Sequence, residues 1–394
     1  MKELRLFLEG VCCDLVRFHH VHTDRVAPEA VRIRQEVPLG DREAFADIVV
    51  EPPGGAPYYV EIKYGHATDR IVRILERKYA PLAPPADGPR RVILVVDLEG
   101  RTDWSANIER VRSAAGPNVA LEIWDEQRVF SMFQSVFGIE IRSWHERDVV
   151  DIQIAIDRAK GEHAFGQDFR NDPLQSALLW HFSYWELKRL YAEAGVARKI
   201  LPPGLYRNVA VVFADLSSFS SFVRDTRDDA VVRSALTSFY AKTRDQVLGT
   251  GGMMYQFLGD GVLALFGLPE ARHDSAEAAL ACAKAFVDIG ASVSLDWQRQ
   301  IDHVQRAGGA HVGLALGDLN IVSLRPFSRA HISAIADSVN TAARLSSAAG
   351  TNEIVASNLF FRALPDGRQS EFTEMPPIDA RNIGTLRAWR TVLG

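Results

Sequence analysis

Hydrophobic positions in residues 1–145 alternate between helical and strand spacing. Leu, Val and Phe recur at helical intervals over 4–18. Two segments rich in β-branched and aromatic residues, AFADIVVE (44–51) and PYYVEIKY (57–64), flank a Pro-Gly turn. The further expected elements are an amphipathic helix at 69–79, buried strands at 90–100 and 118–125, and a helical stretch between those strands. This alternation predicts an α/β domain over residues 1–145.

The next segment, residues 146–206, has a mainly helical pattern. It is rich in Ala, Leu, Arg and Trp and ends at the breaker sequence LPPG (201–204). We interpret it as a helical linker, either a connector or a signalling segment.

Residues 207–394 carry the strongest pattern and form the second expected domain. An apolar strand at 208–215 stops at an aspartate and is followed by a helix start, SSFSSFVRDT. A β-hairpin is expected around LGDG at 253–267. The remaining expected elements are a helix at 273–293, a strand at 309–322, and a helix at 336–350 with Asp337 or Ser338 as N-cap and Gly350 at its end.

Bulk composition narrows the class of protein. A chain of 394 residues favours two domains, and 47% hydrophobic residues is enough to build real cores. A net charge of −5 gives no whole-chain attraction to nucleic acid or anionic lipid. The start MKELRLFLEG lacks a signal-peptide core, and no uninterrupted apolar run reaches the ~18 residues of a membrane span. We therefore expect a cytoplasmic protein with no membrane span.

Two aspartates mark a candidate metal site. Asp215 ends an apolar strand, and Asp260 lies in a Gly-Asp-Gly turn between two apolar strands. If these strands are neighbours in one sheet, both carboxylates lie at the same edge. Such oxygens suit Mg²⁺ or Mn²⁺, and two ions could hold the attacking and leaving oxygens of a phosphoryl transfer. The alternative is that both are ordinary turn aspartates.

Asn340 and Arg344 form a second pair. Their i,i+4 spacing places them on one helix face. An amide can orient a ribose, and a guanidinium can stabilise charge on a phosphate. The alternative is a solvated helix face.

Together these segments resemble the class III adenylate and guanylate cyclase family. FADLSSFS (213–220) resembles its first metal motif, FLGDG (257–261) its second, and DSVNTAARL (337–345) its transition-state helix. Order and spacing match across the whole C-terminal domain. The resemblance implies an α+β fold whose C-terminal domain has a ferredoxin-like βαββαβ core, preceded by the α/β domain.

The resemblance also implies roles for individual residues. Asp215 and Asp260 would hold two divalent cations, Mn²⁺ or Mg²⁺, with the Leu216 carbonyl as a further ligand. Asn340 would position the ribose, and Arg344 would stabilise the reacting phosphorus centre. The backbone expected to receive the terminal phosphates of a nucleoside triphosphate is that of Ser217, Ser218, Phe219 and Ser220.

In this family the site lies between two catalytic domains. The metal aspartates come from one domain and the Asn–Arg pair from the other. Because this chain has one such domain with both sets, the resemblance implies an antiparallel homodimer with two equivalent composite sites.

Base selection is where the sequence departs from the purine cyclases. The position four residues before Asp260 is usually Lys in adenylate and Glu in guanylate cyclases; here it is Gln256. The partner position, seven residues before Asn340, is Ser333. Both side chains donate and accept hydrogen bonds. This departure, with an α/β domain in front, resembles the bacterial Pycsar antiphage pyrimidine cyclases.

That resemblance implies conversion of UTP to 3′,5′-cyclic UMP and pyrophosphate, with the product acting on a separate effector protein. Three alternatives stay open: a cytidylate cyclase, an adenylate or guanylate cyclase with unusual base contacts, and an inactive cyclase-like binding module. The last is disfavoured because all four chemistry positions are filled.

The N-terminal domain has its own weaker motif. Asp47, Glu61 and Lys63 resemble the D…(E)xK core of restriction-endonuclease-like folds. An active nuclease, a nuclease-like fold reused as a sensor or dimerisation module, and an unrelated α/β domain all stay open. The helix that follows is basic and could contact nucleic acid, although a solvated face is favoured; its basic residues are Arg70, Arg73, Arg77 and Lys78.

Cysteines and histidines cluster near the N-terminus. Cys12 and Cys13 precede His19, His20 and His22. These residue types bind zinc, but the spacing matches no zinc motif, so core cysteines beside a His-rich helix end are favoured. With Cys282 the chain has three cysteines, which predicts no disulfide framework.

Overall fold

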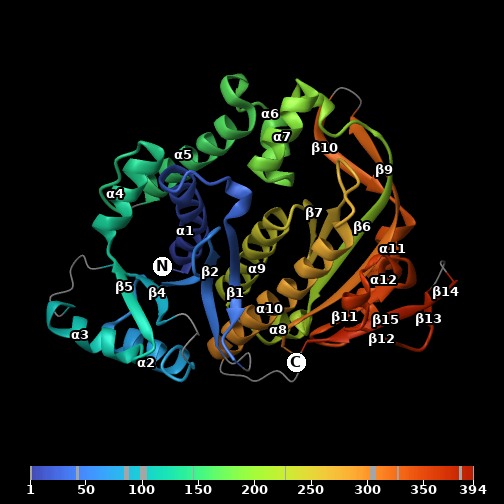
Figure 1. Cartoon of the computed structure of the whole chain (residues 1–394). Coiled ribbons are helices and arrows are strands. Elements are labelled where there is room, and N and C mark those ends of the chain that lie inside the picture. The colour runs from blue at the N-terminus through green and yellow to red at the C-terminus, as the bar shows by residue number, and fades with distance from the viewer. Residues whose placement is uncertain are drawn as a thin grey trace. The chain divides into compact units, whose positions relative to one another are not determined.

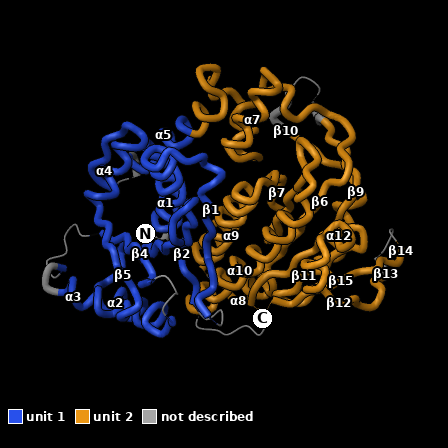
Figure 2. Tube along the Cα trace, in the orientation of Figure 1, with its two compact units in different colours: residues 1–159 blue, residues 160–394 orange. Residues whose placement is uncertain are grey.

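The computed structural model describes residues 2–40, 44–83, 88–97, 104–144, 146–226, 228–301, 308–325, 328–380 and 384–393. It contains two compact units, residues 1–159 and 160–394 (Figure 2). The long helix α5 (Glu146–Phe165) crosses this division. The later helices of the expected linker belong to the second unit.

The first unit is the expected α/β domain, built on a five-stranded sheet in the order β1-β2-β3-β4-β5 (Figure 1). β1 to β3 pair antiparallel, whereas β3, β4 and β5 pair parallel. Its elements are α1 (Lys2–Thr23), β1 (Arg32–Pro38), β2 (Phe45–Glu51), β3 (Tyr58–Ile62), α2 (Thr68–Lys78), β4 (Arg90–Val95), α3 (Trp104–Ala114), β5 (Val119–Trp124) and α4 (Glu126–Phe137). Strand β1 and helix α4 were not anticipated from the sequence.

The central strands of this sheet are buried on both faces. Along β4, Ile93 and Val95 pack in one apolar cluster with residues of α1 and α4. Val92 and Leu94 pack in another with residues of α2 and α3. This two-sided burial explains why RRVILVV lacks polar alternation.

The second unit is organised by β6 (Gly204–Leu216), which lies between β8 (Gly261–Phe266) and β9 (Ala310–Arg325) and pairs antiparallel with both. The full sheet runs β12-β15-β11-β9-β6-β8-β7, with β10 paired to β9. The segment β6-α9-β7-β8-α10-β9 is the expected ferredoxin-like βαββαβ core, because its strands lie in the order β9-β6-β8-β7.

The other elements of this unit complete the sheet and its two faces. They are α6 (Pro173–His181), α7 (Tyr184–Ala194), α8 (Phe219–Asp225), α9 (Asp229–Gly249), β7 (Met253–Leu258), α10 (Ser275–Ile301), β10 (Ser328–Ile335), α11 (Asp337–Ala348), β11 (Glu353–Ser357), α12 (Asn358–Ala363), α13 (Asp366–Gln369), β12 (Thr373–Glu374), β13 (Ile378–Ala380), β14 (Gly384–Leu386) and β15 (Ala388–Val392).

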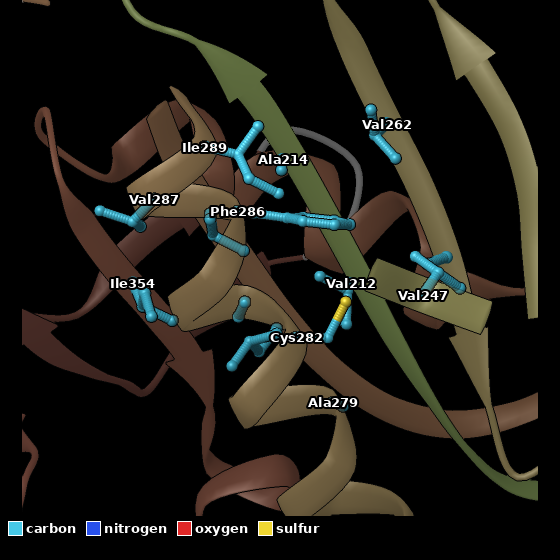
Figure 3. Close-up of a cluster of buried hydrophobic side chains, with 14 of the residues drawn as sticks. Val212, Ala214, Val247, Val262, Ala279, Cys282, Phe286, Val287, Ile289 and Ile354 are labelled. Carbon is cyan, nitrogen blue, oxygen red and sulfur yellow. The ribbon is translucent and has the colours of Figure 1, made fainter. Parts of the chain in front are cut away.

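Helices α9 and α10 cover one face of this sheet. Phe286 and Val287 of α10 belong to one apolar cluster with Val212 and Ala214 of β6 (Figure 3). Over Ser275–Gln300, α10 is long and apolar enough to cross a bilayer, but 67% of its most apolar window is buried inside the protein. Its hydrophobicity is therefore explained by core packing.

Helix α11 covers the opposite face, where β9 presents glycines. A Cβ on Gly313 would lie 2.0 Å from the Ala342 carbonyl oxygen, and one on Gly317 would lie 3.0 Å from the Ser338 Cβ. The residues expected as N-caps are instead inside the helix, and the N-cap is Ala336. The expected end is also corrected, because the C-cap is Ala349. Ser338 is buried toward the sheet, so it packs instead of capping.

We expect Gly313→Ala to destabilise the protein by more than about 2 kcal/mol, because its Cβ would force α11 away from the sheet. Chemical denaturation measures the change. The matched control is Gly249→Ala at the exposed end of α9, where an added Cβ meets nothing within 4 Å; it should be neutral or stabilising. Equal stability of the two variants would contradict the close approach of α11.

Candidate functional site

Two carboxylates meet where β6 ends and β8 begins. Asp215 pairs across the sheet with Gly261, and Asp260 is the residue before Gly261 in the β7–β8 turn. The expectation that these strands are neighbours is thus confirmed. On its other side Asp215 pairs with His311 of β9.

The electrostatics of this pair are unfavourable for two ionised acids. Burial and the negative charge of Asp260, together with a hydrogen bond to Asp260, raise the pKa of Asp215 to about 7. The Nε2 atom of His311 lies 3.7 Å from an Asp215 oxygen, and burial lowers the pKa of this imidazole. Two carboxylates that repel one another are a fitting donor set for a divalent cation, which favours their ionised forms.

Within the described ranges, no group of three or more His, Cys, Asp and Glu side chains could hold a metal. A cation at Asp215 and Asp260 would therefore complete its shell with backbone carbonyls, water or ligand oxygens, as Mg²⁺ commonly does. The Leu216 carbonyl, which the resemblance implies as a further ligand, belongs to the residue directly after Asp215.

The loop after Asp215 corrects one expectation. The N–H of Ser217 donates to the Gly309 carbonyl (2.9 Å), which extends the β6–β9 pairing, so this donor is already used. Ser218 has a left-handed backbone (φ 62°) and is the N-cap of α8. The first bond back along the helix runs from the Phe222 N–H to the Ser218 carbonyl. The N–H groups of Ser218, Phe219 and Ser220 thus precede the helical ladder.

Asn340 and Arg344 are exposed on α11. The side of α11 that packs inward carries other residues, namely Ser338, Ala342, Leu345 and Ser346. The Asn–Arg pair therefore faces away from the sheet of its own chain.

The two residues expected to read the base lie on strands that are linked. Gln256 is exposed on β7, and Ser333 is half-buried on β10. The backbone N–H of Ala334 donates to the Tyr255 hydroxyl (2.8 Å), so the neighbours of both residues are in contact.

Sequence reasoning missed two side chains beside the carboxylates. His311 Nδ1 lies 3.2 Å from the Ser217 hydroxyl oxygen. Tyr240 of α9 stacks on Phe257 with ring centroids 4.1 Å apart, and its hydroxyl donates to the Gly259 carbonyl. Neither carries a motif; only the sheet register and the packing of α9 bring them here.

The N-terminal motif forms a balanced ion-pair cluster. The Lys63 ammonium bonds to Asp47 and lies 2.6 Å from a Glu61 oxygen. The Lys78 ammonium lies 2.9 Å from Glu61 and 3.3 Å from Asp47, and the Tyr79 hydroxyl donates to Glu61 (2.7 Å). Although burial favours the neutral acid, these ammonium groups hold the pKa of Asp47 well below its usual range.

This cluster changes two expectations. Lys78 was expected on a solvated face with Arg70, Arg73 and Arg77; those three arginines are exposed, but Lys78 is turned inward onto the carboxylates. A divalent cation at Asp47 and Glu61 would have to displace an ammonium group already shared by both acids. The three interpretations of this unit stay open, with the metal-dependent one the least supported.

The cysteines near the N-terminus are buried core residues. Burial raises the pKa of Cys12 to about 12, so this thiol stays protonated at neutral pH. Both ring nitrogens of His20 are already hydrogen-bonded, Nδ1 to an Asp24 carboxylate oxygen (2.6 Å) and Nε2 to the Tyr58 hydroxyl (2.8 Å). These observations support the interpretation that Cys12 and Cys13 are core cysteines beside a His-rich helix end.

We expect Asp260→Asn to raise the stability of the metal-free protein at pH 8 by roughly 1 kcal/mol, after allowance for solvent screening. The pKa of Asp215 (about 7) lies above that of an unfolded aspartate. Its contribution to stability is therefore lost as pH rises from about 4 to 7. The same variant should lose the rise in melting temperature caused by Mn²⁺. The control is Asp151→Asn, exposed on α5; an unaltered Mn²⁺ response in Asp260→Asn would refute the site.

Comparison with known proteins identifies the domain that carries this site. The family model of the adenylate and guanylate cyclase catalytic domain matches residues 201–389. The uncharacterized protein Rv1320c of Mycobacterium tuberculosis is 33% identical over 142 residues, 36% of this chain and 23% of the relative. A second uncharacterized protein of Mycobacterium tuberculosis, Rv1319c, is 32% identical over 139 residues, 35% of this chain and 24% of the relative. The chain thus spans about a quarter of the length of these relatives.

Two solved structures are similar at lower identity. The guanylyl cyclase Cya2 has 20% identity and a TM-score of 0.43, covering 49% of this chain and 96% of that one. The adenylyl cyclase CyaB from P. aeruginosa has the same identity and TM-score, covering 49% and 97%. The assignment rests on the family-model match: residues 201–389 are identified as an adenylate and guanylate cyclase catalytic domain.

Proposed function

We propose that this protein is a pyrimidine nucleotide cyclase that converts UTP to 3′,5′-cyclic UMP and pyrophosphate. The observation that carries cyclase chemistry is the Asp215–Asp260 carboxylate pair at the edge of β6 and β8. The observation that favours a pyrimidine is Gln256 on β7, a neutral amide where purine cyclases carry a charged residue.

Asp215 and Asp260, with the Leu216 carbonyl, would hold two divalent cations, Mn²⁺ or Mg²⁺. When bound, such ions lower the pKa of a ribose hydroxyl and neutralise charge on departing pyrophosphate oxygens. In the reaction the O3′–Pα bond forms, the bond from Pα to the bridging oxygen of pyrophosphate breaks, and the hydroxyl proton is released. The chain's own contribution is to place these carboxylates together before substrate arrives.

The Asn340–Arg344 pair supports an antiparallel homodimer. Both side chains are exposed and face away from their own sheet, so they are available to a second copy. In that arrangement Asn340 orients the ribose and Arg344 offsets charge at phosphorus over the partner's carboxylates. The backbone N–H groups of Ser218, Phe219 and Ser220 receive the terminal phosphates. The N–H of Ser217 does not, because it already donates to the Gly309 carbonyl.

Gln256 and Ser333 would read the base. Each can donate and accept, which suits the alternating donor and acceptor edge of uracil. Cytosine also fits an amide, so a cytidylate cyclase is the second candidate on the same observation. We propose that cyclic UMP is a cytoplasmic messenger in antiphage defence and acts on a separate effector protein.

We expect purified protein with Mn²⁺ to turn over UTP on the order of a hundredfold faster than ATP or GTP. A purine leaves polar groups in the pocket unpaired, at about 1–3 kcal/mol for each. Mass spectrometry of products from the four triphosphates measures this. A preference for ATP or GTP would refute the pyrimidine proposal; no product from any triphosphate would support the inactive module.

Mixing inactive Asp260→Ala with inactive Arg344→Ala should restore up to about half of the activity per mixed dimer, since one of its two sites then contains only intact residues. The control is each variant mixed with itself, which should stay inactive. Subunit exchange is verified by mass spectrometry of differently tagged chains. No recovery after verified exchange would contradict the composite site.

A further inference from the structure

Strand β7 breaks its alternation one residue before Gln256. Met254 packs in the core beneath the sheet, and so does Phe257, three residues later. A regular strand cannot direct two residues of odd separation to one face. The β7–β8 pairing shows the cause, a register shift between Met254 and Gln256 that leaves Tyr255 without a cross-strand partner.

The bulge has a consequence on each side of Tyr255. It keeps Gln256 exposed between two core-packed residues. It also leaves Tyr255 outside the regular β7–β8 pairing, and the Tyr255 hydroxyl accepts a hydrogen bond from the N–H of Ala334 (2.8 Å). Since Ala334 follows Ser333, one hydroxyl ties the strand of Gln256 to the strand of Ser333.

Helix α6 contacts both strands from the helical segment that precedes the catalytic domain. Its buried His181 lies with Nδ1 2.5 Å from the Met254 carbonyl oxygen, and because a carbonyl only accepts, Nδ1 carries the proton. The helix is itself fixed by Arg244 of α9, which donates to the carbonyls of Leu179 and Trp180 at 3.0 and 3.1 Å. Trp180 packs edge-on against Phe257, with centroids 6.0 Å apart.

We propose that Tyr255 and His181 are positioning residues for base selection, which hold the strands of Gln256 and Ser333 at the separation that the base requires. This inference rests on the proposed function of Gln256 and Ser333. Neither positioning residue touches the nucleotide. Their effect is to fix two short polar side chains whose hydrogen bonds to a base edge tolerate only a few tenths of an ångström.

The first test is Tyr255→Phe, which removes the hydroxyl and keeps the ring. The ratio of kcat/KM for the preferred triphosphate to that for the next best should fall roughly tenfold, the value of one hydrogen bond. The Mn²⁺ concentration for half-maximal activity should stay within twofold. The matched control is Tyr191→Phe of α7, whose exposed hydroxyl bonds to Asp168 in the same helical segment; it should alter neither quantity.

The second test uses two conservative replacements of His181. An Asn side chain places an N–H near the position of Nδ1, whereas a Gln side chain places it one bond further out. His181→Asn should therefore keep the selectivity ratio, and His181→Gln should lose it by a similar factor. If all His181 and Tyr255 variants change activity toward the four triphosphates equally, the residues are merely structural and the inference is wrong.

Failure of this inference is distinguishable from failure of the proposed function. If wild-type protein prefers ATP or GTP, the pyrimidine proposal fails, yet the selectivity ratio still tests the positioning residues. If no triphosphate is turned over, displacement of a fluorescent nucleotide by each triphosphate gives the same ratio for binding. Wild-type protein that does not discriminate among the four in either assay would overturn both.

Discussion

The antiparallel pairing of β6 with β8 is the constraint on which the catalytic unit depends. It brings Asp215 beside Asp260 and leaves two like charges in partial burial, so that the pKa of Asp215 rises to about 7. A divalent cation bound between the two carboxylates would relieve this repulsion, which is the physical basis of the proposed metal site. The loop to α8 and the β7–β8 turn, as well as Tyr240 and His311, are all arranged around that pair.

The two units use carboxylates in opposite ways. In the first, Asp47 and Glu61 are neutralised within the chain by Lys63 and Lys78, and Tyr79 completes the hydrogen bonds. Removing one partner of such a buried network is costly because it leaves a charge unpaired, so single substitutions in this cluster should destabilise the unit. In the second, no lysine reaches Asp215 or Asp260 among the described ion pairs, and the basic side chain beside Asp215 is His311, whose Nε2 lies 3.7 Å from an Asp215 oxygen.

The glycines of β9 explain how helices pack closely on both faces of the sheet. Val312 and Leu314 bury into the core with α10, while Gly313 and Gly317 let α11 approach the other face closely. That approach fixes which residues of α11 turn inward and leaves Asn340 and Arg344 outward. A side chain at Gly313 would thus disturb a helix whose exposed face is the part proposed to act in a second copy.

The sequence alone determined many of the helices and strands and the two aspartates, because apolar periodicity and the short FADLSSFS and FLGDG segments are local properties. The ferredoxin-like core was implied by the family resemblance of those segments, and the sheet order agrees with it. The sequence did not predict strand β1 (RIRQEVP), because its charged residues hide the alternation expected of a half-buried strand. It did not predict β10 either, because only the pairing with β9 defines that strand. The tertiary structure decided that Lys78 turns inward and that the Ser217 N–H is used in the sheet. It also brought His311 and Tyr240 beside the carboxylates, and Tyr255 and His181 beside the strands of Gln256 and Ser333. Non-local register and helix packing place these side chains, and the neighbouring residues in sequence give no signal of it.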